Sequence, residues 1–376
     1  MKSPRNIHFS GFLKYYDLKV VKSLSRIAII DTVIDARYLS NKEIEHVNLC
    51  DTDTKIIGDA LGHGTMCAMM LDCYTTDFEL INIQVFPDDK PFAVGDVNLL
   101  AKAFEKCLDL NVDIVSVSSV TTLLSDSRLL YDISYRLSEC AIIVGALDNT
   151  GYITLPTSYP HVIGVGTDFA RTLRPGEVAR SNDSALGIDV FANCDTPILR
   201  NHGFGPSNSF AVPIVVAYIN NLLNNGYKKT DIWRVIKEFQ LYSVVKNLVE
   251  FRNSAQRRRN DTPLVFVAAE DEGFYVWLMN NFYEQYEVQS SALSLVNTLY
   301  DVRLKHVHTA DGIQKQVDFM QHCYETDLIF IVGDDRALCS TNADVEIDVA
   351  LTKTDDSVCL KYCGEEESVS LNTIIS

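Results

Sequence analysis

Residues 26–31 read Arg-Ile-Ala-Ile-Ile-Asp, a short apolar run that ends on a carboxylate. A run of four apolar residues between polar ones is typical of a strand that is buried on both faces. Similar runs recur further along the chain at 78–85, 112–117, 141–144 and 162–165, and segments with helical spacing lie between them at 97–108 and 125–137. Strands that alternate with helices of this length predict an α/β fold with right-handed crossovers and a mostly parallel sheet.

The pattern restarts after a change in composition. Residues 252–262 are polar, carry three consecutive arginines and end before Pro263. We interpret this segment as a linker, in preference to a nuclear-localisation or nucleic-acid signal, and as an accessible site for proteolysis. The expected organisation is an N-terminal extension (1–25), a first α/β domain (26–250), a polar and basic linker (251–262) and a small α/β C-terminal domain (263–376).

Apolar spacing predicts the remaining elements. An amphipathic helix is expected over 231–249, at the end of the first domain. In the C-terminal domain we expect strands at 264–267, near 306, and at 328–332, 345–349 and 358–362, with helices at 274–286, 292–300 and 313–324.

Bulk composition limits the possible partners and compartments. The 376 residues are 47% hydrophobic and 22% charged, and the formal net charge is −17. Nucleic acids and anionic membrane surfaces require clustered Lys and Arg, so we expect neither as the main partner. No secretory signal and no apolar run long enough to span a membrane are present. The ten cysteines are scattered and form no CxxC pair, which favours a reducing compartment and predicts a cytoplasmic protein.

Three separate segments carry a carboxylate, an imidazole and a hydroxyl in contexts that suit catalysis. Asp31 ends the first apolar strand, where the loops of a parallel sheet form a crevice. His63 lies between two glycines ahead of an apolar helix. Ser209 precedes another apolar helix, with Pro213 expected in its first turn. The order Asp, His, Ser is one of the known orders of a serine-hydrolase triad, with Asp31 orienting His63 and His63 activating Ser209.

Four segments resemble the sequence motifs of the subtilases, the subtilisin-like serine peptidases. Ile-Ala-Ile-Ile-Asp-Thr-Val-Ile-Asp at 27–35 resembles VAVIDTGID, and Gly-His-Gly-Thr-Met-Cys-Ala at 62–68 resembles GHGTHVAG. Ser-Asn-Ser-Phe-Ala-Val-Pro at 207–213 resembles GTSMASP. Residues 145–151 with 159–166 resemble AAAGNEG…YPSVIAVG. The resemblance covers roughly the first 240 residues, and the four motifs occur in the family's order and spacing.

This resemblance implies a subtilisin-like three-layer fold and a serine endopeptidase that acts on a peptide or protein. It implies Asn149 as oxyanion donor together with the Ser209 backbone N–H. The residues that it places at the substrate are Ser118, Ser119 and Val120 on a strand that pairs with the peptide, and Ala146, Leu147 and Asp148 beside the P1 pocket. No cofactor is expected. The resemblance allows calcium but identifies no residues for it, and the oligomeric state is not predicted.

The chain departs from the family pattern without losing a reacting group. The departures are Val33, Met66, Met69, Ser119-Val120, Asp148 and Ser207-Asn208. At the P1 pocket, Val120, Leu147 and Asp148 predict a narrowed site that accepts Lys or Arg. Cys67 lies one helical turn after His63, so thiol reagents are expected to inhibit by displacing that imidazole.

A specialised cleft and an extra domain favour a selective processing protease, such as one that removes the leader of a ribosomally made peptide. A degradative protease and a catalytically silent scaffold are the alternatives. Only thirty residues precede Asp31, too few for the prodomain that secreted subtilases usually carry. Either folding needs no such helper, or this short segment covers the cleft as an extended inhibitor, a part that the C-terminal domain could also play. His306 and His308 are interpreted as incidental and not as metal ligands. Gly333-Asp334-Asp335 is interpreted as a turn.

Overall fold

The computed structural model describes residues 24–40, 43–50, 61–87, 95–181, 186–242, 262–268, 272–295, 301–307, 313–333, 349–353, 357–362 and 365–370, the last three segments by their backbone alone. Most of the expected N-terminal extension and linker lies outside these ranges, as do His308, Asp334-Asp335 and most of the strand expected at 345–349.

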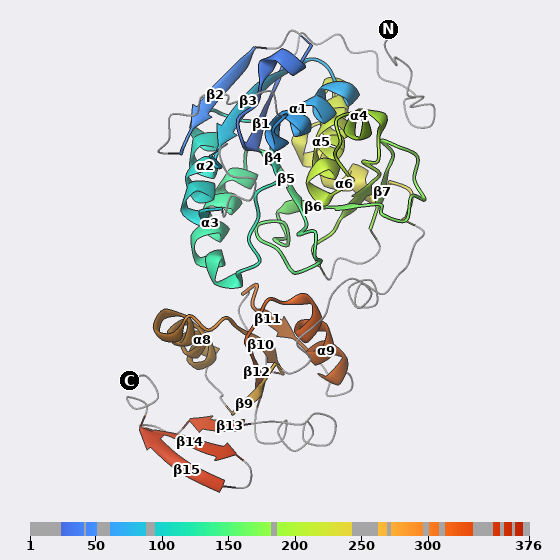
Figure 1. The fold of residues 1–376 in the computed structure, drawn as a ribbon. Helices are drawn as coiled ribbons and strands as arrows, with labels where there is room; N and C mark the ends of the chain where they lie inside the picture. Colours follow the sequence, from blue (N-terminus) through green and yellow to red (C-terminus); the bar gives the residue numbers. More distant parts are fainter. Residues whose placement is uncertain are drawn as a thin grey trace.

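The first part of the chain forms an eight-stranded sheet (Figure 1). The strands, in spatial order, are β2 (Ile44–Asn48), β3 (Phe78–Gln84), β1 (Ser25–Asp31), β4 (Ile114–Val117), β5 (Ile142–Ala146), β6 (Val162–Thr167), β8 (Val190–Ala192) and β7 (Val178–Arg180). All neighbours pair in parallel except β7 and β8. The predicted mostly parallel α/β sheet is therefore confirmed.

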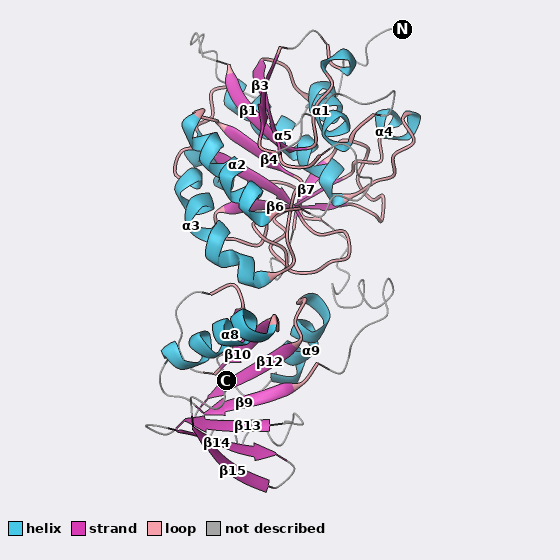
Figure 2. Cartoon of the chain, turned by 60° about the vertical axis from the view of Figure 1, so that its left-hand side comes forward, coloured by secondary structure: helices cyan, strands magenta, loops and turns pink. Residues whose placement is uncertain are grey.

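Helices cover both faces of this sheet (Figure 2). The helices are α1 (His63–Tyr74), α2 (Val97–Asp109), α3 (Ser127–Ser138), α4 (Pro197–Asn201), α5 (Asn208–Asn224) and α6 (Ile232–Lys237). Ala28 and Ile30 of β1 face the core formed with α2 and α3, whereas Ile27 and Ile29 face the core formed with α1 and α5. Side chains alternate along a strand, so an unbroken apolar run supplies both cores at once.

A second, seven-stranded sheet follows. Its order is β11 (Leu304–His306), β10 (Ser290–Ser294), β12 (Leu328–Gly333), β9 (Leu264–Ala268), β13 (Val349–Lys353), β14 (Ser357–Tyr362) and β15 (Glu365–Ser370). The first five strands pair in parallel, and β14 and β15 add an antiparallel extension. Helices α8 (Glu272–Tyr286) and α9 (Ile313–Cys323) pack on this sheet. The exact domain boundaries stay predictions.

Two expected helices differ from the structure. Residues 290–294 form the buried strand β10, not the start of a helix at 292, because Ala292 and Leu293 alternate between opposite faces of the second sheet. The helix expected over 231–249 ends at Lys237, and Leu241 then forms a bridge with Arg180. In both places a short apolar run is compatible with either structure, and tertiary pairing decided the outcome.

No helix in the described ranges is both long and apolar enough to cross a bilayer. No disulfide joins any two of the seven cysteines whose side chains are described.

Candidate active site

Asp31, His63 and Ser209 meet in one chain of contacts. Both carboxylate oxygens of Asp31 lie 2.8–2.9 Å from His63 Nδ1. On the other side of the imidazole, His63 Nε2 lies 2.9 Å from Ser209 Oγ. These are hydrogen-bond distances, and the order carboxylate, imidazole, hydroxyl is the one in which a serine can be activated.

The ends of β1 and α1 bring the acid and the base together. Asp31 is the last residue of β1 and is 2% exposed, and His63 is the first residue of α1. The backbone N–H of Gly64 donates to Thr32 Oγ1 at 2.9 Å. A Cβ atom at Gly64 would lie 2.5 Å from the Thr32 carbonyl oxygen, so only glycine allows the helix to approach the strand this closely.

Further contacts fix the orientation of both groups. The Thr32 N–H donates to Asp31 Oδ1 at 2.7 Å. The His63 ring stacks on Phe210 with ring centroids 4.8 Å apart and planes 29° apart. Burial disfavours charge on the imidazole, but Asp31 and Cys67 together outweigh that effect, and the pKa of His63 is raised well above its ordinary value of 6.5.

Helix α5 presents Ser209 in its first turn. Ser209 is the second residue of the helix, so its backbone N–H has no acceptor within the helical ladder and is free for an incoming oxygen. The expectation that Pro213 lies in the first turn is wrong, because α5 begins at Asn208 and Pro213 falls in the second turn. Its missing N–H leaves the Ser209 carbonyl without its usual helical donor, and Cys67 Sγ lies 3.9 Å from that oxygen.

Asn149 lies beside the start of α5. Its side-chain Oδ1 accepts the backbone N–H of Asn208 at 2.9 Å, so its NH2 end is the part that can donate to another oxygen. Asn208 itself is 4% exposed, and its side-chain Nδ2 donates to the Asp148 carbonyl at 3.0 Å. Asn208 thus ties the Asn149 loop to helix α5. Sequence reasoning recorded it only as a departure from the family pattern, although a polar residue next to Ser209 was a usable signal.

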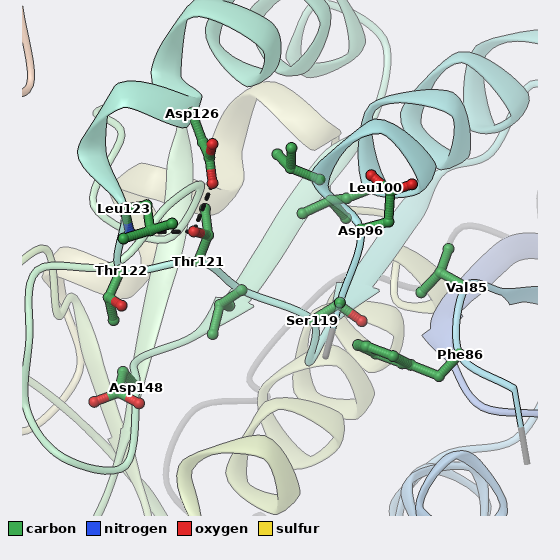
Figure 3. A pocket seen from close by; sticks show the side chains of 13 residues that line it. Val85, Phe86, Asp96, Leu100, Ser119, Thr121, Thr122, Leu123, Asp126 and Asp148 are labelled. Carbon is green, nitrogen blue, oxygen red and sulfur yellow. Dashed lines mark hydrogen bonds between the residues drawn. The ribbon is translucent and has the colours of Figure 1, made fainter. Parts of the chain in front are cut away.

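A cleft of about 640 Å³ is lined by Asp148, the neighbour of Asn149 in the sequence, and by none of Asp31, His63 and Ser209 (Figure 3). Ser119, Val120 and Asp148, three of the residues predicted to bind substrate, line it. Ser118 lies instead with its Oγ 3.8 Å from Cys67 Sγ. Ala146 and Leu147 are buried in the two cores that flank the sheet and are not among the lining residues. The substrate roles of these six residues stay predictions.

Two carboxylates missed by sequence reasoning also line the cleft. Asp96 is exposed at the start of α2, where it caps that helix. Asp126 is half-buried and accepts a hydrogen bond from Thr121 Oγ1 at 2.7 Å, and burial raises its pKa. Asp148 is held by hydrogen bonds from the backbone and hydroxyl of Thr150. Three carboxylates therefore line the cleft, from different sides (Figure 3).

Elements of the second sheet contact both segments that border the cleft. Thr121 and Leu155 form a two-bond antiparallel bridge between these segments. Two residues before Leu155, the Ile153 N–H donates to the carbonyl of Cys323, the last residue of α9, at 2.7 Å. Two further contacts join Ser125 to Gln289 and Arg128 to Glu284. The segment that follows Asn149 is thus held by contacts with α9.

Within the described ranges, one set of three potential metal ligands lies together, namely Asp31, His63 and Cys67. A thiol and an imidazole suit soft metals, whereas calcium requires six or more oxygens. These residues do not fit calcium, and Asp31 and His63 already take part in the contact chain with Ser209.

Comparisons with known proteins give structural likeness only. No family model and no curated protein matches the sequence. Among solved structures, the epidermin leader peptide processing serine protease (EpiP) from Staphylococcus aureus is 15% identical, with 58% of this chain and 69% of that chain covered and a TM-score of 0.44. A cold-adapted subtilisin-like serine proteinase is 16% identical (54% and 76% covered, TM-score 0.40), and a lanthipeptide protease is 16% identical (52% and 72% covered, TM-score 0.39). Function must therefore be argued from the chain's own side chains.

The raised pKa of His63 predicts the acid limit of any activity that uses this imidazole as a base. Only the neutral ring can take a proton, so activity is present above that pKa and is lost as the pH falls through it. We expect the acid limb of kcat/KM against pH to have its midpoint above 6.5. In Asp31→Asn, burial is opposed by Cys67 alone, and the pKa of His63 measured by NMR titration should fall. A midpoint below 6.5, or an unchanged His63 pKa in the variant, would contradict this account.

Mercuric ion is expected to inhibit through Cys67. Its Sγ lies 3.8 Å from His63 Nδ1, so a metal bound to sulfur would displace the imidazole from Asp31. Cys67→Ser should keep its activity in the presence of mercuric ion. Cys107→Ser removes an equally buried thiol on α2 and should remain sensitive. Equal inhibition of the Cys67 variant would exclude the mechanism.

Proposed function

We propose that this chain is a subtilisin-type serine endopeptidase with Asp31, His63 and Ser209 as its catalytic triad. The observation that carries the proposal is the unbroken contact from carboxylate to imidazole to hydroxyl, at 2.8–2.9 Å throughout. The family motifs in the sequence support it independently, because they single out the same three residues.

The proposed mechanism is acyl transfer to water. Ser209 Oγ attacks the peptide carbonyl carbon while His63 Nε2 takes its proton, and Asp31 stabilises the imidazolium. The Asn149 NH2 group and the Ser209 N–H stabilise the oxyanion. His63 then gives the proton to the leaving amine. A water molecule then attacks the acyl carbon and gives a proton to His63. His63 passes this proton to Ser209 Oγ as the acyl group leaves.

We further propose a selective processing role, such as leader removal from a ribosomally made peptide, in the cytoplasm. The three carboxylates that line the cleft and the hydrogen bonds between its bordering segments and the second sheet's elements favour a fixed, charge-selective site over a permissive one. The free thiols of the described cysteines fit a reducing compartment.

Removing the nucleophile tests the activity. Incubation of the full chain with a peptide library should give cleavage products detectable by mass spectrometry. Ser209→Ala should lower the rate by roughly 10⁶-fold, the loss found for subtilisin itself, because the oxygen that attacks the peptide carbonyl is removed. Wild-type protein that cleaves nothing would favour the silent scaffold, and rapid cleavage of casein at many sites would favour a degradative enzyme.

Charge selectivity tests the substrate class. Peptides with Lys or Arg at the position that fills the cleft should be cleaved faster than their neutral counterparts. Asp148→Asn keeps the side-chain shape but removes the charge, and it should reduce this preference about fivefold, as expected for a partly solvated ion pair. Asp132→Asn, on the exposed face of α3, is the matched control. Indifference of the wild type to substrate charge would contradict the assignment.

A further inference from the structure

The nucleophile has a second hydroxyl neighbour. Ser207 Oγ lies 2.8 Å from Ser209 Oγ, as close as the imidazole on the other side. Ser207 replaces the family's glycine two positions before the nucleophile, so this contact is a property of the present chain.

A proton count fixes the direction of this hydrogen bond. The Asp31 carboxylate can only accept, so neutral His63 carries its proton on Nδ1 and accepts at Nε2. Ser209 Oγ has one proton, with which it donates a hydrogen bond to Nε2. Ser209 Oγ can then only accept from Ser207, which must be the donor.

The backbone position of Ser207 makes this orientation unusual. Ser207 is the N-cap of α5, where a serine normally accepts the N–H of the second or third helical residue. Its side chain makes no such capping bond. The second helical residue is Ser209, whose N–H is thereby left for the oxyanion.

We infer that Ser207 is a further catalytic residue, whose hydroxyl stabilises Ser209 Oγ as that oxygen leaves the acyl carbon. This inference rests on the proposed function. In the free enzyme the hydrogen bond is already formed, so it contributes little to the first attack. In the acyl-enzyme Oγ is an ester oxygen and a poor acceptor. The bond strengthens when negative charge returns to Oγ, and such differential stabilisation accelerates deacylation.

The proton of Ser207 never transfers. In deacylation, water gives one proton to His63 Nε2 as its oxygen bonds to the acyl carbon. The C–Oγ bond then breaks, and Oγ takes the proton back from His63. Ser207 donates a hydrogen bond to Oγ throughout, so the step balances without any additional reactant.

Ester hydrolysis separates the two steps. With the p-nitrophenyl ester of an N-acylated amino acid, the good leaving group makes acylation fast, so kcat reports deacylation and kcat/KM reports acylation. Ser207→Ala should lower kcat roughly tenfold, raise the accumulated acyl-enzyme, and change kcat/KM by no more than about twofold. Ser207→Thr retains the hydroxyl and should restore kcat.

Thermal unfolding separates catalysis from capping. Ser207→Ala should leave Tm nearly unchanged, since no capping bond is lost. Thr196→Ala removes the hydroxyl that does cap α4 and should lower Tm without changing the ratio of kcat to kcat/KM. Unchanged ester kcat in Ser207→Ala, or equal losses in both parameters with a lowered Tm, would overturn the inference alone. Wild-type protein that forms no acyl-enzyme would overturn the proposed function and this inference with it.

Discussion

The contact between the Asp31 carboxylate and the His63 imidazole is the interaction on which the rest of the site depends. It joins the end of the central strand β1 to the first residue of α1, and it places one nitrogen of the ring toward Ser209. Without it, burial would disfavour the imidazolium, and either ring nitrogen could carry the proton. The contact requires a strand and a helix end at van der Waals distance, a condition that Gly64 satisfies.

The fold could be predicted where the pattern was unambiguous. The apolar run in β1 supplies both cores of the first sheet, and this explains why strand positions and the α/β class followed from the sequence. Prediction failed where short segments were compatible with two structures. Residues 290–294 are a strand because they pair between β11 and β12, a contact that depends on residues far away in the chain. The short strands β2, β7 and β8 carry too few apolar residues to be recognised.

The three polar groups of the candidate site could be predicted from the sequence, but the contacts of the side chains around them could not. Asp31, His63 and Ser209 stand in segments that resemble family motifs, and the structure brings all three together. Asn208 and Ser207 were predicted only as departures from a motif. The structure shows that Asn208 joins the loop of Asn149 to α5 and that Ser207 contacts Ser209, since such contacts depend on side-chain direction and not on spacing.

Labelling with a fluorophosphonate probe tests the central claim most directly, because phosphonylation requires a serine oxygen activated by a neighbouring base. Mass spectrometry of the labelled full chain should place the adduct on Ser209, with no adduct formed in His63→Ala. Absence of labelling in the wild type, or equal labelling of Ser209 in the His63 variant, would contradict the claim that carboxylate, imidazole and hydroxyl act as one unit.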